Sequence, residues 1–188
     1  MTTYVIMAGL PGTGKSTLAK ALAEKLHGVV LSKDVVRAAL FPGLFTDYSR
    51  EQDDLCFDTL LQAANYLAVR HRTKVIFLDG RTFSRKEQID HAIRAAESSR
   101  CYWKILYITC PDDLAEARII EDASSHPAAN RSVEMYREVK ARFEPIVHPH
   151  LEIDTSGPVH HAVETALRYL SVEVDGNVPL NADGIMSA

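Results

Sequence analysis

The sequence predicts a doubly wound α/β domain with three layers, in which helices cover both faces of a five-stranded parallel sheet and a small helical lid lies at one edge. Three observations support this prediction. Short β-branched and aromatic runs alternate with longer helical patterns along the chain. The run 102–109 is apolar almost throughout, as expected for a strand buried on both faces. A glycine-rich loop follows the first strand and opens the first helix.

The first half of the chain has a regular β–α rhythm. Its elements are expected, in chain order, as strand 3–8, helix 16–26, strand 29–31, helix 33–40, helix 50–72 and strand 74–78. The dipeptide Asp79-Gly80 is expected to form the turn that leaves the last of these strands.

The second half continues with helix 84–98, strand 102–109 and a helix that opens at Pro111. The polar stretch 124–130 contains Pro127 and should interrupt this helix before another one at 132–143, a pattern typical of a mobile flap over an active site. We expect a lid at about 118–135. A short strand at 151–153 and an amphipathic helix at 159–170 should close a domain spanning residues 1–174, and residues 175–188 are expected to form a flexible tail.

Composition narrows the class of protein. The net charge of −4 and the pI near 6.0 disfavour tight sequence-independent binding to nucleic acid, although a local basic groove stays compatible with them. The three cysteines have neither disulfide-scaffold nor zinc-site spacing, which fits a reducing cytoplasm. No targeting segment is evident, and no apolar run approaches the roughly 20 residues needed to span a bilayer.

The glycine-rich loop matches the pattern G-x-x-x-x-G-K-[ST] at every constrained position, in the segment Gly9-Leu10-Pro11-Gly12-Thr13-Gly14-Lys15-Ser16. Glycines let successive backbone N–H groups turn inward around phosphate oxygens, where a side chain would clash. A strand precedes the loop and a helix follows it, which is the structural context that this P-loop motif requires. The sequence therefore predicts a P-loop NTPase fold with a phosphate site.

The residue types in this loop predict Mg·ATP as the ligand. Lys15 would place a positive charge on the β- and γ-phosphates, and Ser16 would offer its hydroxyl to Mg²⁺. The N-terminus of the helix adds a favourable dipole. We assign Gly9, Gly12, Thr13, Gly14, Lys15, Ser16 and Thr17 to nucleotide binding.

Two classes of P-loop protein are disfavoured. No N-K-x-D or T-K-x-D segment is present to recognise guanine, and Asp79 is followed by Gly80 where motor ATPases usually have a glutamate that polarises water. Transfer to an alcohol instead requires that water be excluded and that a base lie near the acceptor hydroxyl.

Asp34 is the candidate for that base. Asp34 and Arg37 lie three residues apart on one expected helix face, so the carboxylate could accept the hydroxyl proton or hold a magnesium-bound water while the guanidinium anchors the acceptor. The alternative is structural, with Ser32 or Asp34 capping the helix and Arg37 solvated.

With these residues in place, the chain resembles the small P-loop kinases that include polynucleotide 5′-kinase, gluconate kinase, chloramphenicol phosphotransferase and zeta-type toxins. The resemblance extends from Tyr4 to about Leu170. It rests on the P-loop, the Ser32-Lys33-Asp34-Val35-Val36-Arg37 segment, the Leu78-Asp79-Gly80-Arg81-Thr82-Phe83-Ser84-Arg85 segment, and the lid ending in Met135-Tyr136 and Phe143-Glu144-Pro145. In that family the aspartate equivalent to Asp34 activates the acceptor.

The resemblance also implies roles for residues outside the P-loop. Asp79 would end the strand beside the P-loop strand and help to hold Mg²⁺ through water, with Arg81 and Thr82 lining the acceptor side. An ordinary turn explains Asp79-Gly80 equally well.

Two arginines are candidates for contact with the phosphates in the lid region. Arg118 would contact the adenine or the phosphates, as related kinases do at this place. The second arginine common in relatives is replaced here by Asp122, so Arg131 is the candidate substitute. A solvated arginine is the alternative for both Arg118 and Arg131.

These inferences predict an ATP-dependent kinase that transfers the γ-phosphoryl group to a hydroxyl of a small-molecule acceptor, with Lys15, Asp34, Arg118 and Arg131 as catalytic residues. Two alternatives stay open, namely a polynucleotide 5′-hydroxyl kinase and a nucleotide-gated regulatory ATPase. The acceptor pocket is expected in the segment 41–54, which carries no recognisable code for its ligand, and the oligomeric state is open.

Overall fold

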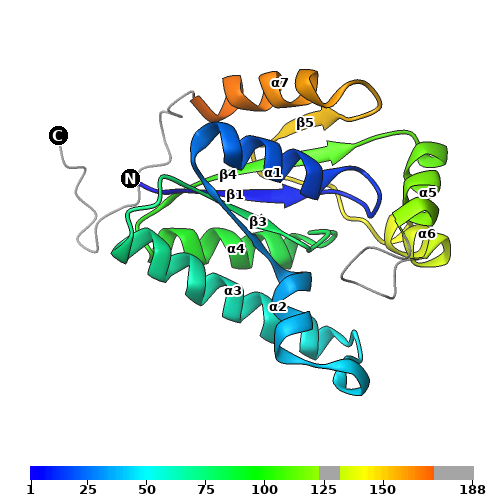
Figure 1. Cartoon of the computed structure of the whole chain (residues 1–188), viewed down its shortest axis with the longest axis horizontal. Helices are drawn as coiled ribbons and strands as arrows, with labels where there is room; N and C mark the ends of the chain where they lie inside the picture. The colour runs from blue at the N-terminus through cyan, green and yellow to red at the C-terminus, as the bar shows by residue number, and fades with distance from the viewer. Residues whose placement is uncertain (123–131, 172–188) are drawn as a thin grey trace.

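The computed structural model describes residues 1–122 and 132–171, which form a three-layer α/β/α domain (Figure 1). The expected 175–188 tail, Arg131 and the expected lid loop 124–130 lie outside the described residues. In chain order the elements are β1 Thr3–Ala8, α1 Lys15–Leu26, β2 Val29–Ser32, α2 Lys33–Leu40, the 3₁₀ helix η1 Gly43–Phe45, α3 Arg50–Arg70, β3 Val75–Asp79, α4 Lys86–Ser98, β4 Tyr102–Thr109, α5 Asp112–Glu121, α6 Val133–Ala141, β5 Leu151–Asp154 and α7 Val159–Ser171.

All five strands are parallel, in the order β2-β3-β1-β4-β5. This confirms the predicted fold class. The P-loop strand β1 is central, and β3 lies directly beside it, so the carboxyl ends of these two strands deliver the P-loop and Asp79 to the same edge of the sheet. Open α/β sheets bind their ligands at this edge.

Alternating side chains of β1 explain why both faces of the sheet are covered. Tyr4, Ile6 and Ala8 pack into one core with α3 and α4. Val5 and Met7 point the other way and pack into a second core with α1 and α7. In Figure 1, accordingly, α1 and α7 lie on one side of the sheet and α3 and α4 on the other.

The helices α5 and α6 pack against each other at the carboxyl end of the sheet (Figure 1). Ala115, Ile119 and Tyr136 form a small apolar core between them, and the Tyr136 hydroxyl donates a 2.8 Å hydrogen bond to Asp112 Oδ1. Both ends of the expected lid are therefore anchored on the domain. Among the described residues, no helix combines the length and the apolar character that a membrane crossing requires.

Candidate active site

The P-loop lies between β1 and α1 and is shaped by close backbone contacts. Gly12 has φ +78°, and a Cβ at this position would lie 2.4 Å from the Ala115 carbonyl oxygen of α5. Gly9 N donates a 3.0 Å hydrogen bond to Thr82 O, which ties the loop to the segment after β3. Only glycine fits at position 12 without displacing α5 or the loop.

Side chains of the P-loop bond back to its own backbone. Lys15 Nζ donates a 2.6 Å hydrogen bond to Leu10 O, and Thr13 Oγ1 donates one of 2.8 Å to the same oxygen. Thr13 is buried and supports the loop from behind, whereas Lys15, Ser16 and Thr17 line a cavity in front of it. The loop is therefore curved around the place where its motif predicts phosphates.

Arg118 of α5 reaches the P-loop at the carboxyl end of the sheet. Its Nη1 lies 3.4 Å from Gly12 O, and its Nη2 donates a 2.8 Å hydrogen bond to the carbonyl oxygen of Thr155, just after β5. The Thr155 hydroxyl accepts a 3.2 Å bond from Arg118 and lies 2.8 Å from Thr13 O. The structure thus places Arg118 beside the P-loop, and Thr155 holds it there.

Asp79 ends β3 as a buried carboxylate. Its residue is 3% exposed, and its Oδ1 has no hydrogen-bond partner among the described residues. Asp79 and the Ser16 hydroxyl line the same cavity. Because a buried carboxylate oxygen without a partner is costly, and because Mg²⁺ prefers oxygen ligands, these two residues fit a magnesium ion that accompanies ATP. An ordinary exposed turn at Asp79-Gly80 does not describe this arrangement.

Gly80 brings the segment after β3 against the start of α2. It has φ +82°, and a Cβ there would lie 2.8 Å from Lys33 N and 3.0 Å from Asp34 N. The loop that carries Arg81 and Thr82 therefore lies beside the first turn of α2. Ser32 takes the N-cap position of α2 but makes no side-chain cap bond, and Asp34 instead engages two cations.

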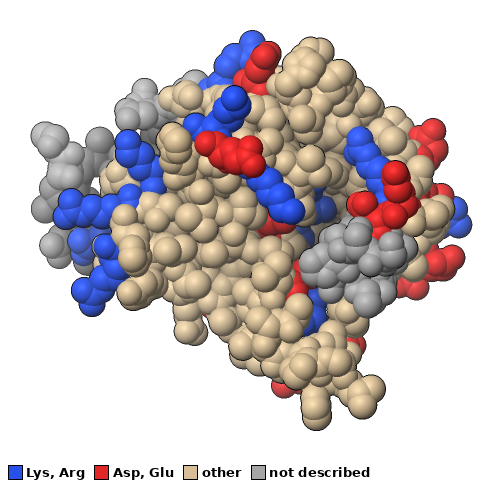
Figure 2. Space-filling model, viewed as in Figure 1, with Lys and Arg blue, Asp and Glu red and all other residues tan. Residues whose placement is uncertain are grey.

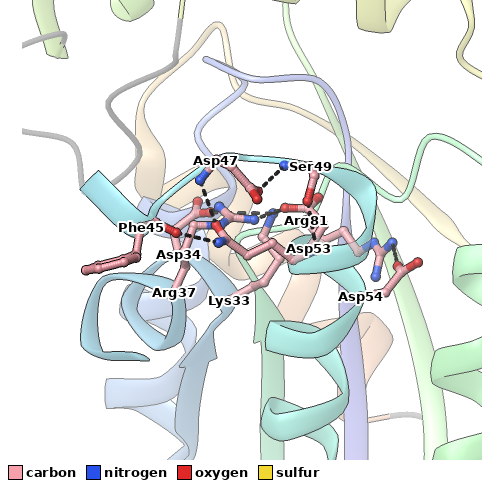
Figure 3. Close-up of polar contacts among 10 residues, drawn as sticks. Lys33, Asp34, Arg37, Phe45, Asp47, Ser49, Asp53, Asp54 and Arg81 are labelled. Carbon is pink, nitrogen blue, oxygen red and sulfur yellow. Dashed lines mark hydrogen bonds and ion pairs between the residues drawn. The ribbon is translucent and has the colours of Figure 1, made fainter. Parts of the chain in front are cut away.

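A cluster of ion pairs joins α2 to the N-terminal turn of α3 (Figure 3). Asp34 Oδ1 lies 3.1 Å from Arg37 Nη1 and 3.5 Å from Lys33 Nζ. Asp53 Oδ1 lies 2.9 Å from Lys33 Nζ and pairs with Arg37 Nη2. Both cations approach the same oxygen of Asp34. The predicted Asp34–Arg37 pair is present, and Arg37 is buried rather than solvated.

Lys33 has an altered pKa in this cluster. Burial lowers the pKa of Lys33 from 10.5 to about 8, with the charges of Arg37 and Arg81 adding to the lowering and Asp34 opposing it. Three cationic side chains therefore lie close enough to repel one another, although aspartates lie among them.

Arg81, from the loop after β3, extends the cluster to Asp54, the residue next to Asp53. Its Nη2 lies 2.5 Å from Asp54 Oδ1, and its guanidinium carbon lies 5.0 Å from the centre of the Phe57 ring. Asp54 Oδ2 in turn lies 3.7 Å from Arg50 Nε. Arg81 and Thr82 both line the cavity.

One cavity of about 810 Å³ contains both halves of this site. We call the part lined by residues 11–17, 118, 155 and 157 the P-loop end, and the part lined by residues 33–53 and 80–88 the ion-pair end. The P-loop end contributes Pro11, Gly12, Gly14, Lys15, Ser16, Thr17, Arg118, Thr155 and Gly157; the ion-pair end contributes Lys33, Asp34, Arg37, Tyr48, Arg50, Asp53, Gly80, Arg81, Thr82, Ser84, Arg85 and Gln88. Asp79 lies at the junction between them.

Comparison with known proteins agrees with this geometry. A family model described as an AAA domain matches residues 5–146, well over half of the chain. The chain belongs to this family.

Two curated proteins resemble parts of the AAA domain. It is 34% identical over 95 residues to the 2′,3′-cyclic-nucleotide 3′-phosphodiesterase of Rattus norvegicus, and this match covers 50% of this chain. It is 24% identical over 155 residues to the tRNA dimethylallyltransferase of Mus musculus, covering 75% of this chain. The matches span 21% and 33% of those two relatives.

Solved structures show where the fold recurs. The APS kinase of Mycobacterium tuberculosis, solved with AMPPNP and APS, superposes on the AAA domain with a TM-score of 0.69 at 17% identity, covering 91% of this chain and 98% of that one. A sugar kinase from Janibacter sp. superposes with a TM-score of 0.64 at 17% identity, covering 90% and 95%. The fold of the AAA domain is therefore that of small P-loop kinases, as predicted.

Three residues of the site were not singled out from the sequence. Lys33 and Asp53 form the centre of the ion-pair end, and the Thr155 side chain connects Arg118 to the P-loop. Asp53 did fall within the segment 41–54, which the sequence marked for the acceptor pocket. Tyr48 and Arg50 of the same segment also line the cavity.

Proposed function

We propose that the AAA domain is an ATP-dependent kinase that transfers the γ-phosphoryl group to a hydroxyl of a small-molecule acceptor. The observation that carries this proposal is that one cavity contains a P-loop at one end and Asp34, the candidate base, at the other. The fold shared with an APS kinase and a sugar kinase supports it.

In this proposal the P-loop end binds ATP. The backbone N–H groups of the loop and Lys15 hold the phosphates, and Arg118, with Arg131 as a further candidate outside the described residues, neutralises charge on the transferring group. Ser16, with Asp79 and Asp34 through water, would hold Mg²⁺, which supplies charge neutralisation on the phosphate oxygens.

At the ion-pair end, Arg37, Arg81 and Thr82 bind the acceptor and Asp34 activates it. The acceptor oxygen forms a bond to the γ-phosphorus, the bond from that phosphorus to the β–γ bridging oxygen breaks, and the hydroxyl proton goes to the Asp34 carboxylate. Because Lys33 and Arg37 both approach Oδ1 of Asp34, Oδ2 is the oxygen that we assign to the hydroxyl.

The first test is ADP release from Mg·ATP, measured with and without sugars, sugar acids, antibiotics, nucleosides and 5′-hydroxyl oligonucleotides. A small-molecule acceptor that raises turnover far above the basal rate supports the proposal. Acceleration by oligonucleotides alone would favour the polynucleotide kinase. Slow hydrolysis that no acceptor accelerates would favour the regulatory ATPase.

The base is tested by Asp34→Asn, which removes the proton acceptor but keeps the size of the side chain. We expect kcat for transfer to fall about a hundredfold to ten-thousandfold. Calorimetric affinity for Mg·AMPPNP should change little, because Asp34 would reach Mg²⁺ only through water, which asparagine can also bind. Asp58→Asn is the matched control, because Asp58 is an exposed aspartate of α3 that pairs with His91. Near wild-type turnover in Asp34→Asn would show that Asp34 is structural.

A further inference from the structure

The ion-pair end has more positive than negative charge. Five basic side chains line it, against two acidic ones, whereas the whole chain carries a net charge of −4. Asp54 pairs with Arg81, and Glu87 with Arg50 and Arg85, from outside the lining; counting both leaves a surplus of one positive charge. The lining residues of this part are Lys33, Arg37, Arg50, Arg81 and Arg85 on the basic side and Asp34 and Asp53 on the acidic side.

Three of these cations lie deep in the protein. Lys33, Arg37 and Arg81 are only 6%, 3% and 5% exposed. Burying a charge is costly unless it is paired and hydrogen-bonded. Nevertheless, Arg37 Nε and Arg81 Nε find no hydrogen-bond partner among the described residues. The cluster is thus not fully satisfied by the protein groups around it.

The carboxylates that do pair with these cations are the more exposed partners. The Asp53 side chain is 29% exposed and the Asp54 side chain 42% exposed; Asp53 belongs to the first turn of α3 and Asp54 follows it directly. Asp34, Asp53 and Asp54 equal the three buried cations in number, but the network is not closed to solvent, because all three cations line the cavity. This arrangement leaves room for an anion from outside.

Arginine is suited to such a ligand. Its planar fork of N–H donors matches a carboxylate or a phosphate with two parallel hydrogen bonds, and lysine adds a point charge. An anion among Lys33, Arg37 and Arg81 would also relieve the repulsion among them. A neutral polyol would gain nothing from this excess of positive charge.

The outer surface distinguishes a small anion from a polymer. On the face shown in Figure 2, the side of the molecule at which the strands end carries mainly acidic side chains. A long polyanion would cross this surface at an electrostatic cost. The positive surplus is a feature of the cavity.

We propose that the acceptor is a small molecule that carries an oxyanion group, a carboxylate or a phosphate, bound by Arg37 and Arg81 with Lys33, while its hydroxyl faces Asp34. This rests on the proposed function. The anion takes up the donors that Asp53 and Asp54 now share, so these two aspartates compete with the substrate for the same cations.

The test compares acceptors that differ only in the anion. Glucitol is paired with gluconate for the carboxylate, since both are open chains, and a nucleoside is paired with its 3′-monophosphate for the phosphate, with 5′-hydroxyl oligonucleotides as the polymer arm. We expect kcat/KM for the anionic member of at least one pair to be about tenfold to a hundredfold higher, since a hydrogen bond to a charged group contributes about 1.5–3 kcal/mol. Equal use of both members of every pair, or use of oligonucleotides alone, would overturn the proposal.

Two variants with opposite expected effects make the assignment specific. Arg81→Gln should raise KM for the anionic acceptor about tenfold and change kcat little, because one charged fork is lost. Asp54→Asn should lower that KM, because it frees Arg81 from its carboxylate. Arg137→Gln, at an exposed arginine of α6 paired with Glu116, is the control and should change neither value. A rise in KM for Asp54→Asn would contradict competition between Asp54 and the substrate.

A binding measurement separates the anion site from the kinase activity. With the P-loop saturated by Mg·AMPPNP, inorganic phosphate should raise the Tm of the wild type and of Arg137→Gln but not of Arg81→Gln. If no acceptor is phosphorylated and this shift is present, the kinase proposal fails and the anion site stands. If the shift is absent as well, both fail.

Discussion

The two ends of the cavity are built differently. The P-loop end is shaped mainly by backbone, with glycines at positive φ within one continuous segment. The ion-pair end is shaped by side chains drawn from three separate segments, which are the start of α2, the start of α3 and the loop after β3 (Figure 3).

The two ends of the cavity should therefore differ in how well they tolerate amino-acid substitution. A backbone cradle tolerates almost no substitution, because its shape depends on φ values that only glycine adopts without strain. A side-chain cluster can be altered one residue at a time without disturbing the sheet. We infer that the P-loop end preserves the chemistry and that the ion-pair end selects the acceptor.

The largest effect is expected from Gly12→Ala, which breaks the backbone cradle. The new methyl group would lie 2.4 Å from Ala115 O at a residue whose φ is +78°. Relieving that clash must move the loop or α5, so we expect calorimetric affinity for Mg·AMPPNP to fall on the order of a hundredfold, equivalent to about 3 kcal/mol.

Gly43→Ala is the control for this substitution. Gly43 also has a positive φ, of +55°, but a Cβ there meets nothing within 4 Å. It therefore keeps the backbone strain and removes the clash. If both variants lose nucleotide affinity equally, the close approach to Ala115 is not what shapes the P-loop.

The next effect concerns the ion-pair end, where charge rather than backbone shape is decisive. In the proposed site protonated Lys33 contacts the anion. Burial lowers the pKa of Lys33 to about 8, so this charge is lost as the pH rises through that value. We expect kcat/KM for the anionic acceptor to fall by up to about tenfold per pH unit above that point. The groups around Lys33 are Asp34 and Arg37 of α2, Asp53 and Cys56 of α3, and Arg81.

Lys33→Arg supplies the control, because arginine stays charged throughout this range. Its kcat/KM profile between pH 6.5 and 9.5 should be flatter than that of the wild type, whatever its absolute rate. A Lys33→Arg variant that retains the full decline above pH 8 would assign the titration to another group.

The fold was more predictable from the sequence than the ion-pair end. β1 and β4 begin and end at the predicted residues, because an apolar strand between turn residues is a local pattern. The boundaries that shifted have local causes. α3 ends at Arg70 rather than at the expected residue 72, since Arg72 adopts a left-handed conformation with φ +50°. α4 begins at Lys86, because Ser84 instead accepts a backbone hydrogen bond from Glu144.

Within the site, too, some residues could be named from the sequence and others could not. The P-loop motif and the spacing of Asp34 and Arg37 are visible in the sequence itself, whereas Arg81 and Arg118 were named through the family resemblance. The pairing of Lys33 with Asp53 joins residues 20 positions apart on two helices, and no periodic pattern encodes such a contact. A lysine beside an aspartate at a helix start usually indicates a solvated surface, so only the packing of α2 on α3 reveals that Lys33 is buried.

The smallest effect on nucleotide affinity is expected from Thr155, a side chain that supports the P-loop end. Thr155 bridges Arg118 to Thr13 O through one hydroxyl. Thr155→Val keeps the shape and removes that hydroxyl, which should weaken Mg·AMPPNP binding by about 1 kcal/mol, roughly fivefold. Thr155→Ser restores the hydroxyl and should recover the affinity. A loss as large as that of Gly12→Ala would show that Arg118 and Thr155, and not the glycines alone, shape the nucleotide site.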